Sequence, residues 1–240
     1  MQRQGLRGAD KLRKVGIKTG FTKYAEGSCL IEQGNTKVIC TATVEDGVPF
    51  FLRNTGSGWI TAEYGMLPRS CLTRVKRDGR RGQTSGRTYE IQRLIGRVLR
   101  GVVELDKLGE RSILIDADVI QADGGTRCAS ITGCFVALVE ALKGLKRDKV
   151  FNKLPLTDFV AAVSVGIVRG EVLLDLSYDE DSKAEVDMNV AMTSSGELVE
   201  VQATAEGSPF SVDKMNELTR LAGAGIQKLI SLQKEVLKIK

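Results

Sequence analysis

The chain has 240 residues, 42% of them hydrophobic and 27% charged, a composition typical of globular proteins, and its net charge is +5. The absence of histidine excludes Ser-His-Asp and Cys-His catalysis and His-ligated metals, so any metal should be a hard, oxygen-bound ion such as Mg²⁺ or Mn²⁺. Five cysteines without a CxxC pair predict reduced thiols in a cytoplasmic protein, and no apolar run approaches the roughly 20 residues that cross a membrane.

Alternating β-branched and aromatic residues predict four strands in the first half of the chain. The four predicted strands are Val15–Thr19, Ser28–Gln33, Thr36–Val44 and Trp59–Met66. Gly and Asn residues separate them, and Gly34-Asn35 is a hairpin-turn signal between the second and the third. Residues 69–86 have no apolar period and are rich in Gly, Ser and Arg. We expect a mobile basic loop there that becomes ordered when RNA or DNA binds.

Two helices flank a buried strand in the middle of the chain. Helical spacing of apolar residues after Ser85-Gly86 predicts a helix of about 18 residues. The apolar run Ile113–Ile120 is typical of a buried strand, and it breaks at Asp123-Gly124-Gly125. A second helix is expected over Thr126–Leu142.

Beyond Pro155, the sequence predicts a second strand-rich region and a last helix from about Val212. The expected strands are Phe159–Val168, Glu171–Tyr178, Glu185–Met192 and Glu197–Ala203, with a hairpin signal at residues 168–171. This order of elements predicts an α/β (α+β) fold with mixed sheets. No linker is visible, so we expect one domain over residues 1–240.

The glycine turn before the second predicted helix has the features of an anion site. A helix that begins there leaves N–H groups near Gly125 and Thr126 unpaired at the positive end of its dipole. Arg127 lies in the first turn, where its planar guanidinium could clamp a phosphate. An ordinary strand–turn–helix connection is the alternative.

Positive charge is concentrated in one block. Residues 69–100 contain ten Lys and Arg against Asp78 and Glu90, a net of +8, whereas the other 208 residues carry −3. Nine of the ten are Arg, the residue better suited to phosphate contact and base stacking. The block therefore predicts a polyanion-binding surface, with a solvated loop and a salt-bridged helix face as the alternative.

Acidic residues are concentrated in residues 175–187. Asp181 and Asp187 are an even number of residues apart, so on one continuous strand they would share a face, unless Ser182-Lys183 forms a turn. Two converging carboxylates could hold a divalent cation, or one of them could have a raised pKa. A solvated acidic hairpin tip is the alternative.

Several long segments resemble, in order, the RNase PH family of bacterial tRNA-processing phosphorolytic exoribonucleases. They include GWITAEYGMLPR at 58–69, SGRTYEIQRLIGR at 85–97, DADVIQADGGTR at 116–127 and LDLSYDEDSKAEVDMNV at 174–190. The resemblance implies a ribosomal-S5-domain-2-like fold, usually assembled as a homo-hexameric ring. It also implies 3′-to-5′ trimming of RNA, tRNA precursors above all and rRNA as a related role, with inorganic phosphate as co-substrate and nucleoside diphosphates as products.

The resemblance also implies roles for individual residues. Phosphate binding falls on Arg87, Gly125, Thr126 and Arg127, and RNA binding on Arg69, Arg74, Arg77 and Arg93. Catalysis and Mg²⁺ (or Mn²⁺) binding fall on Asp181 and Asp187. The chain departs from the family pattern at Gln4-Gly5-Leu6-Arg7, at Leu12-Arg13-Lys14-Val15 and at Cys71-Leu72. A catalytically idle RNA-binding ring subunit and a hydrolytic nuclease are the alternative functions.

Overall fold

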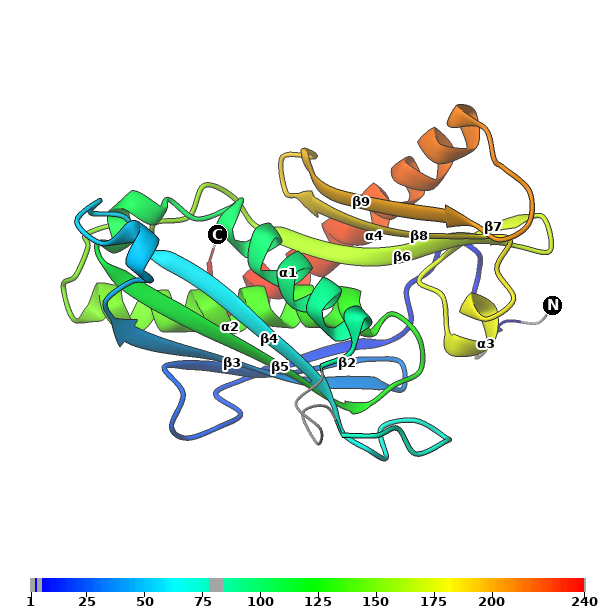
Figure 1. Cartoon of the computed structure of the whole chain (residues 1–240). Coiled ribbons are helices and arrows are strands. Elements are labelled where there is room, and N and C mark those ends of the chain that lie inside the picture. Colours follow the sequence, from blue (N-terminus) through cyan, green and yellow to red (C-terminus); the bar gives the residue numbers. More distant parts are fainter. Residues whose placement is uncertain (1–2, 4–5, 78–83, 240) are drawn as a thin grey trace.

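The computed structural model describes residue 3, residues 6–77 and residues 84–239. The described residues form two β-sheets with helices between them (Figure 1). Residues 78–83, which include Arg80 and Arg81 of the basic block, lie outside the described residues, as do Gln4 and Gly5.

The first sheet has five strands in the order β1-β2-β3-β5-β4. They are β1 (Val15–Thr19), β2 (Gly27–Gln33), β3 (Thr36–Asp46), β4 (Trp59–Met66) and β5 (Arg111–Gln121). The turn Gly34-Asn35 joins β2 to β3 as predicted, with Gly34 at φ +60°. Strands β4 and β5 are parallel and are connected through α1 (Gly86–Arg100), with the short 3₁₀ helices η2 (Phe50–Leu52) and η3 (Leu105–Leu108) nearby in the chain.

The second sheet has four antiparallel strands in the order β7-β6-β8-β9. They are β6 (Val160–Val168), β7 (Glu171–Leu174), β8 (Val186–Thr193) and β9 (Leu198–Ala205). Arg169 and Gly170 form the predicted two-residue turn, both with positive φ as such hairpins require. Strand β6 is buried along its whole length.

Helix α2 (Thr126–Arg147) lies between the two sheets and contacts β2 and β3 on one side and β6 on the other (Figure 1). Helix α1 packs against β4, and α4 (Val212–Leu237) packs against β6. One hydrophobic cluster contains residues of both sheets. Contrary to the expectation from apolar runs, α2 is long and apolar enough to cross a bilayer, but 78% of that window is buried inside the protein.

The structure confirms the predicted fold class and corrects two local predictions. Strand β7 ends at Leu174, so the strand predicted over residues 175–178 is wrong, and Tyr178–Asp181 forms the short helix α3. Asp175 adopts φ +57°, which a strand cannot accommodate. Asp181 and Asp187 therefore do not share a strand: Asp181 ends α3, and Asp187 lies in β8 after a turn.

Candidate active site

The glycine turn between β5 and α2 is pressed against the segment that begins α3. Gly124 and Gly125 have φ values of +76° and +66°, and Gly125 is the N-cap of α2. A Cβ atom on Gly124 would lie 2.6 Å from the Leu176 carbonyl oxygen and 2.7 Å from the Tyr178 nitrogen. Glycine is thus required at position 124 by both conformation and space, and the turn places the start of α2 beside α3.

Thr126, the first residue of α2, is held by a residue that the sequence analysis did not single out. The Tyr64 hydroxyl, from β4, donates a hydrogen bond of 3.0 Å to Thr126 Oγ1. Burial raises the pKa of Tyr64, although this hydrogen bond and the charges of Arg87 and Arg127 oppose the rise. The signal for Tyr64 was its position inside the segment at 58–69, but only the fold brings β4 to the end of α2.

Arg127 points toward α1 and β9. Its Nη1 lies 3.2 Å from Glu90 Oε1 and also donates to the Gln202 side-chain oxygen, while Gln202 Nε2 donates to Glu90 Oε1 at 2.7 Å. Arg87 lies in the exposed first turn of α1, where the Ser85 hydroxyl caps the helix by accepting from the Thr88 N–H at 3.1 Å. The two arginines thus reach the site from different helices.

Asp181 lies close enough to Asp187 to affect the ionisation of Asp187. Burial raises the pKa of Asp187, the Asp181 carboxylate raises it further, and Arg127, Asn189 and Arg87 act against the rise. Burial by neighbouring atoms also raises the pKa of Asp181, and Arg87, Arg127 and Arg13 oppose it. The structure therefore gathers two carboxylates and two candidate phosphate-binding arginines from α1, α2, α3 and β8.

Asn189 orients Asp187 from the neighbouring position on the same face of β8. Its Nδ2 lies 3.3 Å from Asp187 Oδ2 and 3.5 Å from Oδ1. The buried Cys128 thiol donates to Asn189 Oδ1 at 3.2 Å. Because burial raises the pKa of Cys128 far above neutral pH, the thiol stays protonated and remains a donor. The Asn189 amide thus holds the Asp187 carboxylate, and the buried Cys128 thiol in turn holds Asn189.

The carboxylates of Asp181 and Asp187 suit a hard cation only if other ligands contribute. In the described ranges no group of three or more His, Cys, Asp or Glu side chains could hold a metal ion. Two carboxylates supply oxygen ligands, and Mg²⁺ is usually bound by one or two carboxylates together with substrate phosphates and water. Asp181 and Asp187 therefore fit a Mg²⁺ ion that is shared with a phosphate-bearing substrate.

A buried ionic network, which the sequence analysis missed, holds the segment that leads into α3. Arg3 pairs with Glu180 (Nε to Oε1, 2.7 Å), and Arg7 contacts Asp175 and Glu180 at 3.4 and 3.1 Å. Arg13 pairs with Asp175 at 2.7 Å, and Asp175 is completely buried. The N-terminal segment thereby fastens the chain just before Asp181, although its partners lie more than 160 residues away in the sequence.

The candidate RNA-binding arginines lie on the surface around the cluster. Arg69, Arg74 and Arg77 are exposed in the loop after β4. Two backbone bonds, Leu67 N to Val119 O and Ala122 N to Ser70 O, attach this loop to the end of β5, next to the glycine turn. Arg93 is exposed on α1 and lines a groove of about 360 Å³ between α1 and β9.

The predicted alternative of a salt-bridged basic block has little support in the part of the chain that is described. There, Arg97 pairs weakly with Glu200 at 3.8 Å, and Arg100 stacks on Trp59 with its guanidinium 4.3 Å from the ring centroid. No ion pair within the described ranges involves the exposed arginines Arg69, Arg74, Arg77, Arg87 and Arg93. Their charge is available to a polyanion.

Comparison with known proteins places these features in a family. The model of the 3′ exoribonuclease family matches residues 11–143 with its domain 1 and residues 158–225 with its domain 2. Ribonuclease PH of Moorella thermoacetica is 59% identical over 237 residues, which cover 99% of this chain and 95% of that protein. Ribonuclease PH of Syntrophomonas wolfei is 55% identical over 239 residues and 100% of both chains.

Solved structures with this fold include subunits of larger assemblies. A chain from the Archaeoglobus fulgidus exosome, solved with RNA bound to the active site, superposes with a TM-score of 0.81 at 24% identity, covering 96% of this chain and 92% of its own. Rice (Oryza sativa) Rrp46 superposes with a TM-score of 0.79 at 18% identity, covering 98% and 100%. At these identities the likeness is one of fold.

Proposed function

This chain belongs to the 3′ exoribonuclease family in its ribonuclease PH branch, and we propose that the cluster at the starts of α1 and α2, the end of α3 and the middle of β8 is its active site. The enzyme is a phosphorolytic 3′-to-5′ exoribonuclease of the tRNA nucleotidyltransferase type. It trims the 3′ ends of RNA, tRNA precursors among them, with inorganic phosphate, and releases nucleoside diphosphates.

The observation that carries the site assignment is the packing of the glycine turn at the start of α2 against the segment that begins α3, together with the charges of Arg87 and Arg127, which act on both Asp181 and Asp187. Arg87, Arg127 and the N–H groups at the start of α2 orient inorganic phosphate and neutralise its charge. A phosphate oxygen attacks the last phosphodiester of the RNA, and the bond to the 3′ oxygen of the preceding nucleotide breaks. The product keeps both phosphates as a nucleoside 5′-diphosphate.

The departing 3′ oxygen needs a proton or a positive charge. Asp187 lies in an environment that raises its pKa, so it can hold a proton for this oxygen, and Asn189 keeps its carboxyl in place. In the alternative, an ionised Asp187 would together with Asp181 hold Mg²⁺, which would supply charge neutralisation for the same oxygen in place of the proton. Positioning and charge neutralisation can carry most of a phosphoryl transfer, so a histidine is not required.

RNA approaches over the basic surface formed by Arg69, Arg74, Arg77 and Arg93. The exposure of these side chains supports the assignment, as does the attachment of their loop to the end of β5. Phosphate contacts from such arginines are independent of sequence and therefore suit an enzyme that removes any terminal nucleotide.

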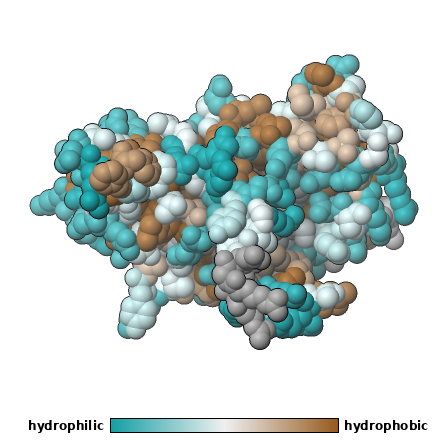
Figure 2. Space-filling model, in the orientation of Figure 1, coloured by the Kyte–Doolittle hydropathy of each residue, from teal (hydrophilic) through white to brown (hydrophobic). Residues whose placement is uncertain are grey.

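The enzyme acts as a homo-oligomer, a hexameric ring, in the cytoplasm. Apolar side chains remain on the surface near η2 and near the start of α4 (Figure 2), including Phe50 at 84%, Phe51 at 63% and Val212 at 68% exposure. Such side chains favour contact with further subunits. The five cysteines are free thiols, which suits a reducing compartment.

One experiment separates this function from the alternatives. The protein is incubated with an RNA that carries a 3′ tail, with and without inorganic phosphate, and the released mononucleotide is identified. Nucleoside diphosphates formed only with phosphate are the expected result. Monophosphates formed without phosphate would indicate a hydrolytic nuclease, and binding without shortening would indicate an idle RNA-binding subunit.

A further inference from the structure

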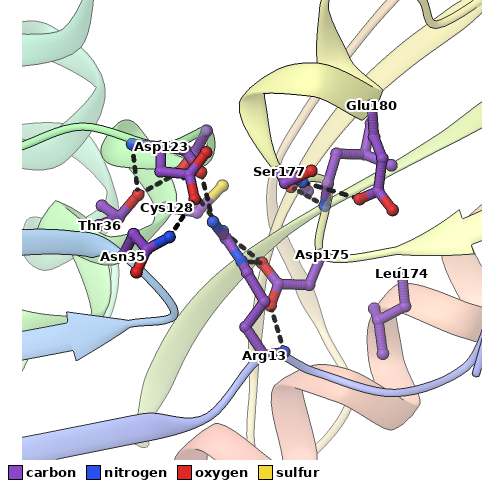
Figure 3. Close-up of polar contacts among 12 residues, drawn as sticks. Arg13, Asn35, Thr36, Asp123, Cys128, Leu174, Asp175, Ser177 and Glu180 are labelled. Carbon is purple, nitrogen blue, oxygen red and sulfur yellow. Dashed lines mark hydrogen bonds and ion pairs between the residues drawn. The ribbon is translucent and has the colours of Figure 1, made fainter. Parts of the chain in front are cut away.

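The side chain of Arg13 lies between the glycine turn and the segment that leads into α3 (Figure 3). Its Nε and Nη2 donate to Asp175 Oδ1 at 3.1 and 2.7 Å, and its backbone N–H donates to Oδ2 at 2.7 Å. On the other side, Nη1 donates to the Asp123 carbonyl oxygen and Nη2 lies 3.3 Å from that of Gly124. Arg13 is 7% exposed and Asp175 is fully buried.

A second side chain holds the same turn from β3. The Thr36 hydroxyl donates to the Gly124 carbonyl oxygen at 2.7 Å and accepts from the Asp123 N–H at 3.0 Å (Figure 3). Thr36 is fully buried, so its hydroxyl is not diverted to solvent. Arg13 and Thr36 thus share the Gly124 carbonyl oxygen, and each binds one further backbone group of Asp123, its carbonyl oxygen or its N–H.

These contacts determine the direction of the N–H groups in the turn. In a trans peptide the C=O and N–H bonds point in opposite directions. Because the carbonyls of Asp123 and Gly124 are directed at Arg13 and Thr36, the N–H groups of Gly124 and Gly125 point away from them. Among the residues that the structure describes, no acceptor binds either N–H.

We infer that Arg13 and Thr36 are positioning residues for the phosphate-binding turn, an inference that rests on the proposed function. They fix the peptide planes of residues 123–125 so that the free N–H groups are presented to inorganic phosphate together with the first turn of α2. Four of the five guanidinium N–H groups of Arg13 already have protein acceptors. Arg13 therefore acts through the turn and does not bind phosphate itself.

Arg13 has a second effect that Thr36 lacks. By pairing with Asp175 it joins the turn to the chain six residues before Asp181, in a backbone that is held at φ +57°. The phosphate-binding turn and the catalytic carboxylate are thereby held as one unit. The two residues should consequently differ in their kinetic effects.

The test compares Thr36→Val and Arg13→Lys in steady-state trimming assays, with inorganic phosphate and RNA titrated separately. Thr36→Val removes one hydroxyl and no charge, so the KM for phosphate should rise about 3- to 10-fold, with kcat and the KM for RNA unchanged. Arg13→Lys should raise the KM for phosphate and also lower kcat, because it loosens the segment before Asp181.

Two variants serve as matched controls. Arg7→Lys alters the same ionic network but touches no atom of the turn, and Lys14→Ala removes the exposed charge next to Arg13. Both should keep the wild-type KM for phosphate, even where thermal stability falls in Arg7→Lys.

A wild-type KM for phosphate in Thr36→Val would overturn the inference, as would equal rises in the KM for phosphate and the KM for RNA. If Arg13→Lys does not fold, Thr36→Val alone decides. A wild-type enzyme that shortens RNA without phosphate would instead refute the proposed function, before any variant is compared.

Discussion

Arg127, at the start of α2, and Glu90, in α1, are joined by an ion pair, with Arg127 Nη1 3.2 Å from Glu90 Oε1. Arg127 is the side chain proposed to clamp phosphate, so the anion and Glu90 compete for one guanidinium. Glu90 is roughly half exposed, and a partly exposed pair of this kind is worth only a modest free energy. Phosphate can therefore displace it.

Replacing Glu90 with Gln should strengthen phosphate binding. The amide can still accept from Arg127, but the negative charge that repels phosphate is gone. We expect the KM for phosphate to fall by roughly 2- to 5-fold in steady-state assays. Glu104→Gln, which removes the same charge at the start of η3, should leave the KM for phosphate unchanged. A raised KM in Glu90→Gln would mean that the carboxylate positions Arg127 instead of competing for it.

Arg127→Ala and Arg87→Ala should each weaken the use of phosphate far more than the binding of RNA. Loss of a charge-assisted contact costs roughly 1.5–3 kcal/mol, which is about 10- to 150-fold in kcat/KM for phosphate. Arg97→Ala, which removes an exposed cation from the same helix as Arg87, is the control. Wild-type phosphate kinetics in both variants would remove the two arginines from the site.

Asn189→Ala should shift the pH dependence of turnover. The Asn189 amide stabilises the charged form of Asp187, so its removal should raise the pKa of Asp187 further. The limb of the kcat profile that reports Asp187 should then move to higher pH, whether the protonated or the ionised form is active. An unshifted profile in Asn189→Ala would contradict the proposed contact. As a companion variant, Asp187→Asn should collapse turnover and abolish that limb of the profile, while the affinity for RNA is kept.

Glu180 should contribute stability that is lost in acid. Burial alone would raise its pKa, but hydrogen bonds from Arg3 and the Ser177 N–H, with the charges of Arg3 and Arg7, lower it to about 2. Because the pKa of Glu180 is lower in the folded than in the unfolded chain, the ionised carboxylate stabilises the fold at pH values above the unfolded-state pKa of about 4.5. This stability is lost as the pH falls from about 4.5 toward 2. Glu180→Gln should therefore lower the free energy of unfolding in urea by roughly 1–3 kcal/mol at pH 7, and by less at pH 3.

The control for this measurement is Glu171→Gln, which alters an exposed carboxylate on β7. It should leave the unfolding free energy nearly unchanged at both pH values. A loss in Glu180→Gln that is the same at pH 7 and pH 3 would show that the ionised carboxylate is not the source of the stability.

Neutralising Arg74 and Arg77 together should reduce the salt dependence of RNA binding. Each phosphate contact contributes about 0.7–0.9 to the slope of log affinity against log salt, so the slope should fall by roughly 1–2. Fluorescence anisotropy with a labelled RNA measures it, and Arg220→Gln with Lys228→Gln, two exposed cations of α4, is the charge-matched control. An unchanged slope would identify the loop as a solvated surface.

Local pattern alone predicted much of this protein. The hairpins at Gly34-Asn35 and Arg169-Gly170, the strand before Asp123 and the helix that begins at Thr126 follow from turn chemistry and apolar periodicity, which act over a few residues. The excess of arginine in residues 69–100 and the glycine turn likewise pointed to a polyanion and an anion site. Such features depend on residues that are neighbours in the sequence.

The tertiary structure decided what the local pattern could not. The parity of Asp181 and Asp187 suggested one strand, yet Asp181 ends the short helix α3, and a turn separates it from Asp187 in β8. The fold nevertheless places Asp181 close enough to affect the ionisation of Asp187. The pairing of Arg13 with Asp175 left no local signal, because the two residues are 162 positions apart. Burial of either charge is tolerated only when the two are paired, and the pairing forms only in the complete fold.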